Sequence, residues 1–340
     1  MTVVDGVRLV SNSEVQTFKD CPRKWWLAWY RGLKSRNRQV VSARSTGTRI
    51  HVALAELYRP NGVTHDAMRM LLDAQDVDRR EFETQRAAVN FNEDTELKSF
   101  DEYERTLLSA FDLEHAMIEG YLEWIQETGV DSQLEVISAE QKIEVELTTL
   151  PLSLRSAWGD TIKLIAKLDA RVRSTVTGAI KFIDHKTVGS LYDATLGINQ
   201  QMLHYHVIED ATTEPGQPRA EGALYNMLRK VKRTRASRKP YYLRIPIDHN
   251  RYELNGYRNQ LYGVISRLNL TEVWLGQRPQ QHQAVVPPRP SRDCTWKCEF
   301  FKICRMFDDG SRVEAAIEEH YVAGDPLAYY DDKEESGESN

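Results

Sequence analysis

Apolar residues along the chain follow two different periods. Up to about residue 130 they recur at helical spacing, most clearly over residues 101–128, where one face is apolar. That face carries Tyr103, Leu107, Phe111, Ile118, Tyr121 and Ile125. Beyond it, apolar and polar residues alternate, which is typical of half-buried strands. We therefore predict a helical N-terminal region over residues 1–130 and a sheet-containing core over residues 131–285.

Further helices are predicted in the N-terminal region. Ser13 and Gln16 have the spacing of a capping box, which predicts a helix that continues through the following cysteine and tryptophans. A second helix is expected to begin near Thr46 and to carry His51. Residues 60–100 are polar and weakly patterned, which favours a helical insertion on the surface.

Alternation predicts the strands of the core. A first strand is expected around residues 143–147, and the alternation is cleanest over residues 162–172, where one face is apolar. The opposite face of that strand carries Lys163, Lys167, Asp169 and Arg171. The other predicted elements are a turn at 177–178, a strand over 180–186, a helix over 194–209, strands near 221–228 and 241–247, and a helix over 250–275. This order predicts an α/β fold with a mixed central sheet flanked by helices.

Composition narrows the class of protein. With 340 residues, 41% of them apolar and 28% charged, the chain can bury a substantial core. No secretory leader and no apolar run of membrane-spanning length is found, so a cytoplasmic protein without a membrane partner is expected. The net charge of −5 gives no global sign of a nucleic-acid partner. Residues 326–340 are predicted to be an acidic, disordered tail, because the last ten residues contain five acidic and no aliphatic side chains.

Acidic residues of two predicted strands form a candidate catalytic centre. Asp184 and Lys186 are two residues apart on one strand, so their side chains project to the same face. Asp169 is expected to end the polar face of the preceding strand, and a short turn would pair the two strands. Two carboxylates suit Mg²⁺ or Mn²⁺, which would activate water against a phosphate, while Lys186 offsets developing charge. The alternative is a surface ion pair, since three-residue motifs occur by chance.

The order of these elements resembles the RecB-type branch of the PD-(D/E)XK nuclease superfamily. The resemblance is carried by His51 on an early helix, Asp169 on a strand, the run Ile-Asp-His-Lys-Thr at 183–187, and Gln201 with Tyr205 on the following helix. It covers residues 11–306. The branch includes the AddB nuclease domain, the iron–sulfur exonucleases of CRISPR adaptation, and related phage exonucleases.

The resemblance implies a restriction-endonuclease-like core and a role for each matching residue. The implied metal ligands are His51, Asp169 and Asp184, and the implied catalytic lysine is Lys186. Gln201 and Tyr205 are implied to position the active site and the DNA backbone. The sequence departs from the branch at Ala166, where glycine is common, and at His185, where tyrosine is commoner. The His185 side chain is expected on the opposite face of its strand.

One further acidic residue is a weaker candidate for the site. Glu140 is expected to open a strand, where relatives often carry an acidic residue. It can serve beside the metal ligands or be a solvated strand end, and the sequence does not separate the two.

Four cysteines are a candidate metal site. Cys294, Cys298 and Cys304 lie within eleven residues, and the other cysteine, Cys21, precedes a proline, two basic residues and two tryptophans. In a reducing compartment such spacing favours a metal. The resemblance implies a [4Fe–4S] cluster that clasps the N-terminal region to the predicted C-terminal segment 286–325, although relatives have two residues rather than three between the first C-terminal pair. The alternative is structural Zn²⁺, although zinc ribbons generally use two C-x-x-C knuckles.

Basic residues gather in one segment before the last predicted strand. They are Arg229, Lys230, Lys232, Arg233, Arg235, Arg238 and Lys239, and two tyrosines, Tyr241 and Tyr242, follow them. Such a patch can neutralise phosphates while tyrosines stack on unpaired bases. The alternative is a solvated hairpin loop. The remaining tryptophans and tyrosines are predicted to be core residues.

These features together predict an Mg²⁺- or Mn²⁺-dependent deoxyribonuclease. The resemblance implies an exonuclease that acts on single strands or duplex ends in recombination or end processing, with a recombinase or single-strand annealing protein as a partner. Two alternatives remain: a non-cleaving DNA-binding subunit that has kept the nuclease fold, and a zinc-stabilised interaction protein.

Overall fold

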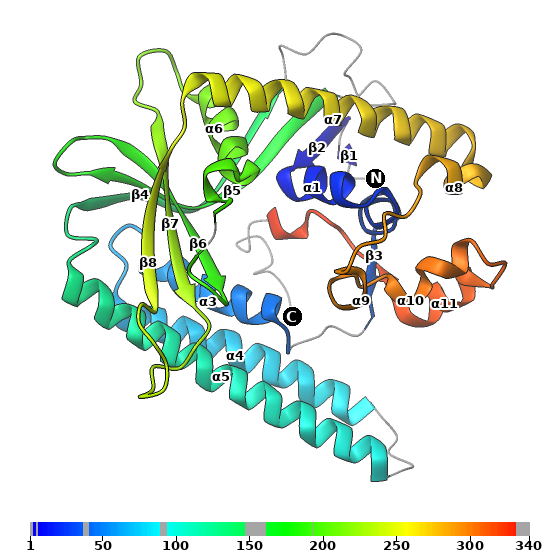
Figure 1. Ribbon diagram of the computed structural model, residues 1–340, viewed down its shortest axis with the longest axis horizontal. Coiled ribbons are helices and arrows are strands. Elements are labelled where there is room, and N and C mark those ends of the chain that lie inside the picture. The colour runs from blue at the N-terminus through cyan, green and yellow to red at the C-terminus, as the bar shows by residue number, and fades with distance from the viewer. Residues whose placement is uncertain are drawn as a thin grey trace, which may run out of the picture.

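The computed structural model describes residues 3–4, 6–36, 41–88, 94–146, 161–192 and 194–330. Among them, a mixed seven-stranded sheet has the order β1-β2-β5-β6-β7-β8, with β4 paired to β5. The strands are β1 (Val3–Val4), β2 (Val7–Ser11), β4 (Leu134–Glu146), β5 (Thr161–Ser174), β6 (Ile180–Val188), β7 (Ala220–Arg229) and β8 (Tyr242–Asp248). β2 is parallel to β5 and β6 to β7, while the other pairs are antiparallel. The predicted α/β fold with a mixed central sheet is confirmed (Figure 1).

The sheet opens along one edge of β5. β2 pairs with the first part of β5, up to Ile165, and β6 pairs with its last part, from Ala170 to Arg173. β4 pairs with the opposite edge of β5 from Lys163 to Ser174. On the edge of β5 that β2 and β6 share, no described strand pairs with residues 166–169, which lie between the two. Asp169 lies at this opening and not at the end of its strand, so the prediction that it ends a strand was wrong.

The first helices differ from the predicted ones. α1 (Asn12–Asp20) is capped by Ser11, whose hydroxyl accepts the N–H of Glu14 at 3.2 Å, so the capping box predicted at Ser13 was wrong. Cys21 then has an extended backbone, and α2 (Pro22–Trp25) begins at the proline and continues into a π-helical segment, η1 (Trp26–Tyr30). Proline disfavours helical backbone in the residue before it but suits the first position of a helix. The predicted single helix is therefore interrupted at Cys21.

Three longer helices follow, and they build the helical region that the sequence predicts. α3 (Ala43–Leu57) begins at its cap Ser42, before the expected Thr46, while α4 (Thr64–Ala88) and α5 (Asp94–Thr128) form the antiparallel pair along the lower side of Figure 1. Arg49 of α3 is buried between them. Its guanidinium donates to Glu114 of α5 at 2.6 and 2.9 Å and is ion-paired with Asp78 of α4. This buried ion network fixes α3, which carries His51, against the helical pair.

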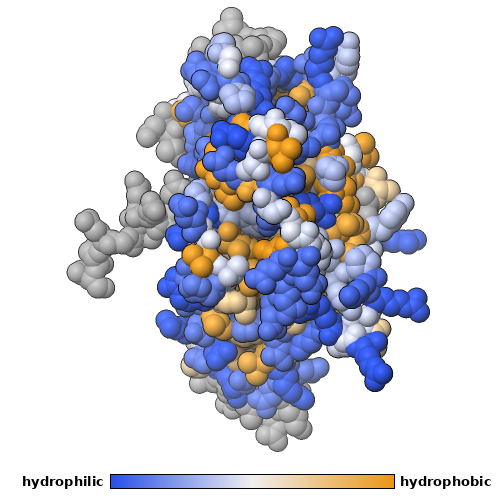
Figure 2. All heavy atoms as spheres, turned by 90° about the vertical axis from the view of Figure 1, so that its left-hand side faces the viewer, coloured by the Kyte–Doolittle hydropathy of each residue, from blue (hydrophilic) through white to orange (hydrophobic). Residues whose placement is uncertain are grey.

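Helices cover both faces of the sheet. α1, α6 (Gln200–Thr212) and α7 (Arg251–Gln277) cover one face, whose core includes Phe182 and Tyr225. α3 and α5 cover the other face, whose core includes Tyr121 and Ile183. Neighbouring residues of β6 therefore point to opposite layers, as strand geometry requires. Figure 2 shows the left-hand side of Figure 1, where β4 and β8 lie, and on this side hydrophilic residues surround scattered apolar ones.

The N-terminal and C-terminal segments meet, as predicted. After the 3-10 turn η4 (Pro279–Gln281), the C-terminal segment consists of short elements: α8 (His282–Val285), α9 (Cys294–Lys297), α10 (Phe301–Cys304), η5 (Arg305–Phe307), α11 (Val313–His320), β9 (Tyr321–Ala323) and η6 (Ala328–Tyr330). β9 pairs with β3 (Leu33–Ser35), and the buried Arg23 donates to the Val286 carbonyl at 2.9 Å. Trp26 stacks on His282 with ring centroids 4.9 Å apart. Strand pairing, a buried hydrogen bond and ring stacking thus hold the two ends of the chain together.

Aromatic residues divide between the core and the surface. Trp25, Trp26 and Trp29 are buried, as predicted. Among the described residues, five aromatic side chains predicted to be core residues are exposed instead: Tyr192, Tyr252, Trp274, Trp296 and Tyr329.

Some predictions lie outside what the structure tests. Residues 331–340, most of the predicted tail, are outside the described residues. The boundaries placed at residues 130 and 285 stay predictions, although β2 of the N-terminal region joins the central sheet. Among the described helices, none combines the length and the apolar character needed to cross a membrane.

Candidate active site

The two strand carboxylates and the lysine come together at the opening of the sheet. The ladder between β5 and β6 stops at the pair Ala170–Ile183, so Asp169 and Asp184 are the next residues across from each other. Beyond this point the backbone N–H of His185 donates to Asp169 Oδ2 at 2.8 Å in place of a ladder hydrogen bond. Asp169 and Asp184 are 5% and 1% exposed, which makes them unusual for carboxylates. Burial without a full set of partners is typical of a functional group.

Lys186 is held by two groups in the same layer. Its ammonium donates to Gln201 Oε1 at 2.8 Å and lies 2.8 Å from Asp184 Oδ2. That carboxylate oxygen is buried and accepts no hydrogen bond of good geometry, so the lysine contacts it as an ion pair only. This Asp184 oxygen therefore keeps lone pairs that no hydrogen bond of good geometry occupies.

Gln201 connects the lysine, the acid and a tyrosine. α6 begins at Gln200, with Asn199 as its cap, and this places Gln201 in the first turn. Its amide nitrogen donates to Asp184 Oδ1 at 3.1 Å and to the Tyr205 hydroxyl at 2.7 Å, one helical turn further along. The structure thus brings the predicted Gln-x-x-x-Tyr pair to the acidic centre.

His51 approaches Asp169 from α3. Its Nδ1 lies 3.6 Å from Asp169 Oδ2, and its ring meets the His185 ring edge-on at 5.9 Å. His185 is on the opposite face from Asp184, as expected, with Nδ1 2.8 Å from Asn226 Nδ2. Asn226 in turn donates to the Tyr121 hydroxyl at 2.8 Å. α3 passes close to β6 here, because a side chain at Gly47 would lie 3.3 Å from Thr187 Oγ1.

The electrostatics of the two carboxylates diverge. Burial favours the protonated form of Asp169, but His51 and the N–H of His185 outweigh it and lower its pKa to about 2. Burial raises the pKa of Asp184 to about 6, with Lys186 opposing and Asp169 reinforcing the shift. Burial lowers the pKa of His51 and of Lys186, yet the neighbouring carboxylates raise both pKa values overall. The cationic side chains of His51 and Lys186 thus offset part of the negative charge of this centre.

Glu140 joins this centre in a way that the sequence did not predict. It lies inside β4 and not at its start, between the register pairs Ala139–Ala170 and Gln141–Leu168, and therefore opposite Asp169. Its backbone is left-handed, with φ of 50°, and its carboxylate pairs with Lys167 at 3.1 Å. Burial raises the pKa of Glu140, and the charge of Asp169 adds to the shift. No periodic pattern signals a single left-handed residue within a strand.

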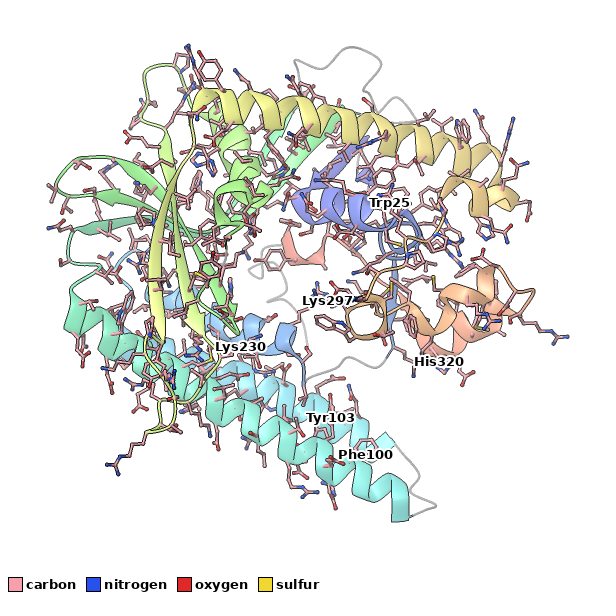
Figure 3. All side chains as sticks on the ribbon, viewed as in Figure 1. Trp25, Phe100, Tyr103, Lys230, Lys297 and His320 are labelled. Atoms are coloured by element: carbon pink, nitrogen blue, oxygen red, sulfur yellow. The ribbon has the colours of Figure 1, made fainter. Side chains whose placement is uncertain are left out.

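The basic segment lies against α5. Arg233 pairs with Glu123 at 2.7 Å and Lys232 with Asp112 at 3.4 Å, so two basic side chains of the segment are paired with acids of α5. Gly120 permits this approach, since a side chain there would clash with Arg233. Lys230 lies at the lower end of β7 in Figure 3. Arg235 is exposed.

The two tyrosines after the basic segment are held by protein contacts. The Tyr242 hydroxyl donates to the Met117 carbonyl at 3.0 Å, and the side chain is 5% exposed. Tyr241 is half-buried and bonds the Ser237 carbonyl at 2.9 Å. The buried Tyr242 ring is not free to stack on a base, so the stacking prediction was wrong for Tyr242. For the half-buried Tyr241 it stays a prediction.

The four cysteines gather where the two ends of the chain meet. Burial raises the pKa of Cys298 and of Cys304, and each also senses the charge of Cys21. Backbone N–H groups point at two of the sulfurs, from Arg289 to Cys21 at 3.5 Å and from Ser291 to Cys294 at 3.3 Å. Thiols that are near one another and accept N–H groups suit a thiolate-bound metal.

Metal-binding geometry itself is not preformed. Within the described ranges, no three His, Cys, Asp or Glu side chains are arranged as a metal site, either at the acidic centre or among the cysteines. At the acidic centre, His51 contacts Asp169 and Lys186 is ion-paired with Asp184. The donor types nevertheless fit a hard divalent cation, with two carboxylates and an imidazole.

Comparison with known proteins identifies the family. The profile of the PD-(D/E)XK nuclease superfamily matches residues 9–305, a span that includes the acidic centre, Gln201, Tyr205 and all four cysteines. No curated protein matches the chain. Nucleases of this superfamily generally hydrolyse DNA with Mg²⁺ or Mn²⁺, and the mixed sheet flanked by helices agrees with their restriction-endonuclease-like fold. The chain therefore belongs to the PD-(D/E)XK nuclease superfamily.

Proposed function

We propose that the protein is a DNA exonuclease of the RecB/AddB type that uses Mg²⁺ or Mn²⁺ and acts on single strands or duplex ends. The observation that carries this proposal is the convergence of Asp169, Asp184 and Lys186 at the opening of the sheet, with His51 3.6 Å from Asp169. A surface ion pair would be exposed, whereas both carboxylates here are buried. A non-cleaving descendant would have no need to keep all of these groups.

Each residue has a chemical role in this proposal. Asp169, Asp184 and His51 would hold the divalent cation, which when bound polarises the scissile phosphate and lowers the pKa of a water. The Asp184 charge favours the ammonium form of Lys186, which suits it to stabilise charge that develops on the phosphate. Gln201 fixes the positions of that ammonium and of the Asp184 carboxylate.

We further propose that Cys21, Cys294, Cys298 and Cys304 bind a [4Fe–4S] cluster. The proposal is supported by the nearness of the four thiols and by the N–H groups directed at two sulfurs. Burial raises the pKa of Cys298 and of Cys304, but Lys24 and Arg23, respectively, oppose that rise. Zn²⁺ is the competing occupant, since it takes the same ligands. Iron, sulfide and zinc measured on anaerobically purified protein separate the two.

Digestion from an end is tested with topologically different substrates. Linear single-stranded, linear duplex and circular single-stranded DNA are incubated with the protein and Mn²⁺. An exonuclease shortens the linear substrates progressively and leaves the circles intact. Rapid cleavage of circles would show an endonuclease instead. Release of mononucleotides from one end would suit a role in recombination, where a recombinase or annealing protein receives the remaining strand.

A further inference from the structure

The last described residues of the chain return to the acidic centre. In Figure 1 the red segment runs from α11 back across the middle of the molecule towards the sheet. It ends in η6, where Tyr330 is 8% exposed and the pKa of its phenol is raised by burial and lowered by hydrogen bonds with Ser11 and Ser13. Tyr330 thus anchors this segment beside the start of α1.

The neighbouring Tyr329 does not share that burial. Its side chain is 58% exposed, and its ring meets Tyr330 edge-on at 5.3 Å and 82°. The Lys167 ammonium lies 5.3 Å from the centre of the Tyr329 ring. Because more than half of this side chain is exposed even with Lys167 and Tyr330 against its ring, part of the ring surface stays accessible to a ligand.

Strand geometry places this ring close to the catalytic carboxylates. Lys167 and Asp169 are two residues apart on β5 and project to the same face, which separates them by roughly 7 Å. Glu140, opposite Asp169, pairs with Lys167 and fixes it beneath the ring. Partial burial raises the pKa of the Tyr329 phenol, and the carboxylates of Glu140, Asp169 and Asp184 raise it further. The ring is therefore a neighbour of the acidic centre on the solvent side.

We propose that Tyr329 is a stacking platform for an unpaired base next to the scissile phosphate. This proposal rests on the proposed nuclease function and narrows the substrate to single-stranded DNA or a frayed duplex end, because a base inside a duplex has no free face. Aromatic stacking is tolerant of base identity, so the platform holds the strand without selecting a sequence. Lys167 contributes a positive charge beneath the ring.

The chain offers a matched control at Tyr252. That side chain is 72% exposed, and Arg251 lies over its ring at 5.0 Å, which reproduces the exposed ring and the cation of Tyr329. Tyr252 lies at the start of α7, just after β8 ends. This end of β8 pairs with the first residues of β7, at a distance from the acidic centre. Tyr252→Ala therefore removes an equivalent side chain without altering the proposed platform.

The test measures binding of a fluorescent single-stranded oligonucleotide in EDTA, so that no cleavage interferes. Tyr329→Ala is expected to weaken binding by between about 5-fold and about 150-fold, the range for loss of one base–aromatic stack. Tyr329→Phe and Tyr329→Trp keep the ring and are expected to bind like wild type, as is Tyr252→Ala. A series of oligonucleotides with one abasic position each then locates the stacked base. Wild type should lose affinity at one position near the end, whereas Tyr329→Ala should be insensitive there.

Several results overturn the platform. They are unchanged binding by Tyr329→Ala, loss of binding by Tyr329→Phe, an abasic effect of equal size in wild type and Tyr329→Ala, or no binding of single strands by wild type. Metal-dependent cleavage of duplex DNA together with any of these would leave the nuclease function standing. A clear abasic pattern without any metal-dependent cleavage would support the stacking platform and contradict the nuclease function.

Discussion

Lys186 is ion-paired with Asp184 and is still exposed enough to contact a phosphate. Its ammonium is fixed by Gln201 and Asp184, yet 30% of its side chain is exposed, whereas only 1% of the Asp184 side chain is exposed. The lysine is therefore the member of the pair that can reach a phosphate from the solvent side. Asp184 stays behind it, with an oxygen that accepts no hydrogen bond of good geometry.

Lys186→Ala should separate metal binding from chemistry. We expect the variant to bind Mn²⁺ at least as well as wild type, because removing the ammonium frees Asp184 to contact the metal. The cleavage rate should fall by roughly 10²- to 10⁴-fold, the usual cost of losing a group that assists proton transfer and charge development. Titration calorimetry with Mn²⁺ and single-turnover cleavage measure the two effects. A lysine whose removal abolished metal binding instead would have a purely structural role.

Buried histidines make the folded state sensitive to acid. Burial lowers the pKa of His204 and of His206 to about 4, and both side chains are nearly inaccessible. In the unfolded chain both titrate near about 6.5, so between 6.5 and 4 the unfolded state binds more protons. Their contribution to stability is therefore complete above pH 6.5 and is lost as the pH falls towards 4. Asp184, whose pKa is raised to about 6, acts in the opposite sense.

Urea unfolding at several pH values tests this dependence. Each histidine should add roughly 1.4 kcal/mol per pH unit to the slope of the unfolding free energy within its window. His204→Gln removes one titrating ring, and its slope between pH 6 and 5 should be shallower than that of wild type by about this amount. Equal slopes would mean that His204 has the same pKa in the folded and unfolded states, which contradicts the lowered pKa.

At the scale of elements, the contact between the basic segment and α5 divides its charges into two groups. Lys232 and Arg233 are paired with acids of α5, whereas Arg235 is exposed and Lys230 is half-buried. Paired residues must exchange one anion for another when they meet a phosphate, so they release fewer counterions. Lys230 and Arg235, for which the described part of the chain provides no acidic partner, should therefore carry most of the salt dependence of DNA binding.

The salt dependence of binding tests this division. Lys230→Ala with Arg235→Ala should lower the slope of log affinity against log salt by about 1.4 to 1.8, since each lost contact with a phosphate contributes about 0.7 to 0.9. The matched control, Lys232→Ala with Arg233→Ala, should lower it by less. Identical slopes in both double variants and wild type would mean that the segment faces away from DNA.

Strand periodicity predicted the elements that carry the acidic centre, but not the geometry that creates it. Alternation over 162–172 and 180–186 correctly paired β5 with β6, because a short turn leaves an antiparallel hairpin as the simple solution. The opening beside Asp169 depends on β2. This strand has only five residues close to the N-terminus, and it was not predicted from the sequence. Glu140 was a candidate from the sequence, but its place opposite Asp169 was not predicted because it depends on a left-handed residue inside β4. The position of Tyr329 was not predicted because it depends on contacts between distant parts of the chain.

At the scale of the whole molecule, the two ends of the chain are joined by more than the cysteines. β3 pairs with β9, Arg31 pairs with Glu314 at 2.7 Å, and Arg23 reaches Val286. Figure 3 shows Lys297, next to Cys298, on the side of the C-terminal segment that faces the middle of the molecule. A bound cluster would add metal–thiolate bonds to a contact that already exists, and it would close a very long loop.

Cys298→Ser should therefore loosen the ends without unfolding the core. We expect a colourless protein whose terminal segments are cleaved by trypsin sooner than those of wild type. The central sheet should resist trypsin as well as it does in wild type. Reduction of the intact wild-type cluster should leave the cleavage rate nearly unchanged, because hydrolysis transfers no electrons. Limited proteolysis followed by mass spectrometry measures the first effect. Stoichiometric zinc without sulfide in wild type would contradict the iron–sulfur assignment and leave the acidic centre as the basis of the function.

The most direct test of the nuclease assignment compares wild type with Asp184→Ala on end-labelled single-stranded and duplex DNA. Wild type should shorten DNA with Mn²⁺ or Mg²⁺ and be inactive in EDTA. Asp184→Ala should fold, bind DNA with affinity close to that of wild type in EDTA, and lose at least about 10³-fold in rate, since it lacks a ligand whose metal supplies several kcal/mol. Near-normal Mn²⁺-dependent cleavage by Asp184→Ala, or cleavage by wild type that persists in EDTA, would contradict the assignment.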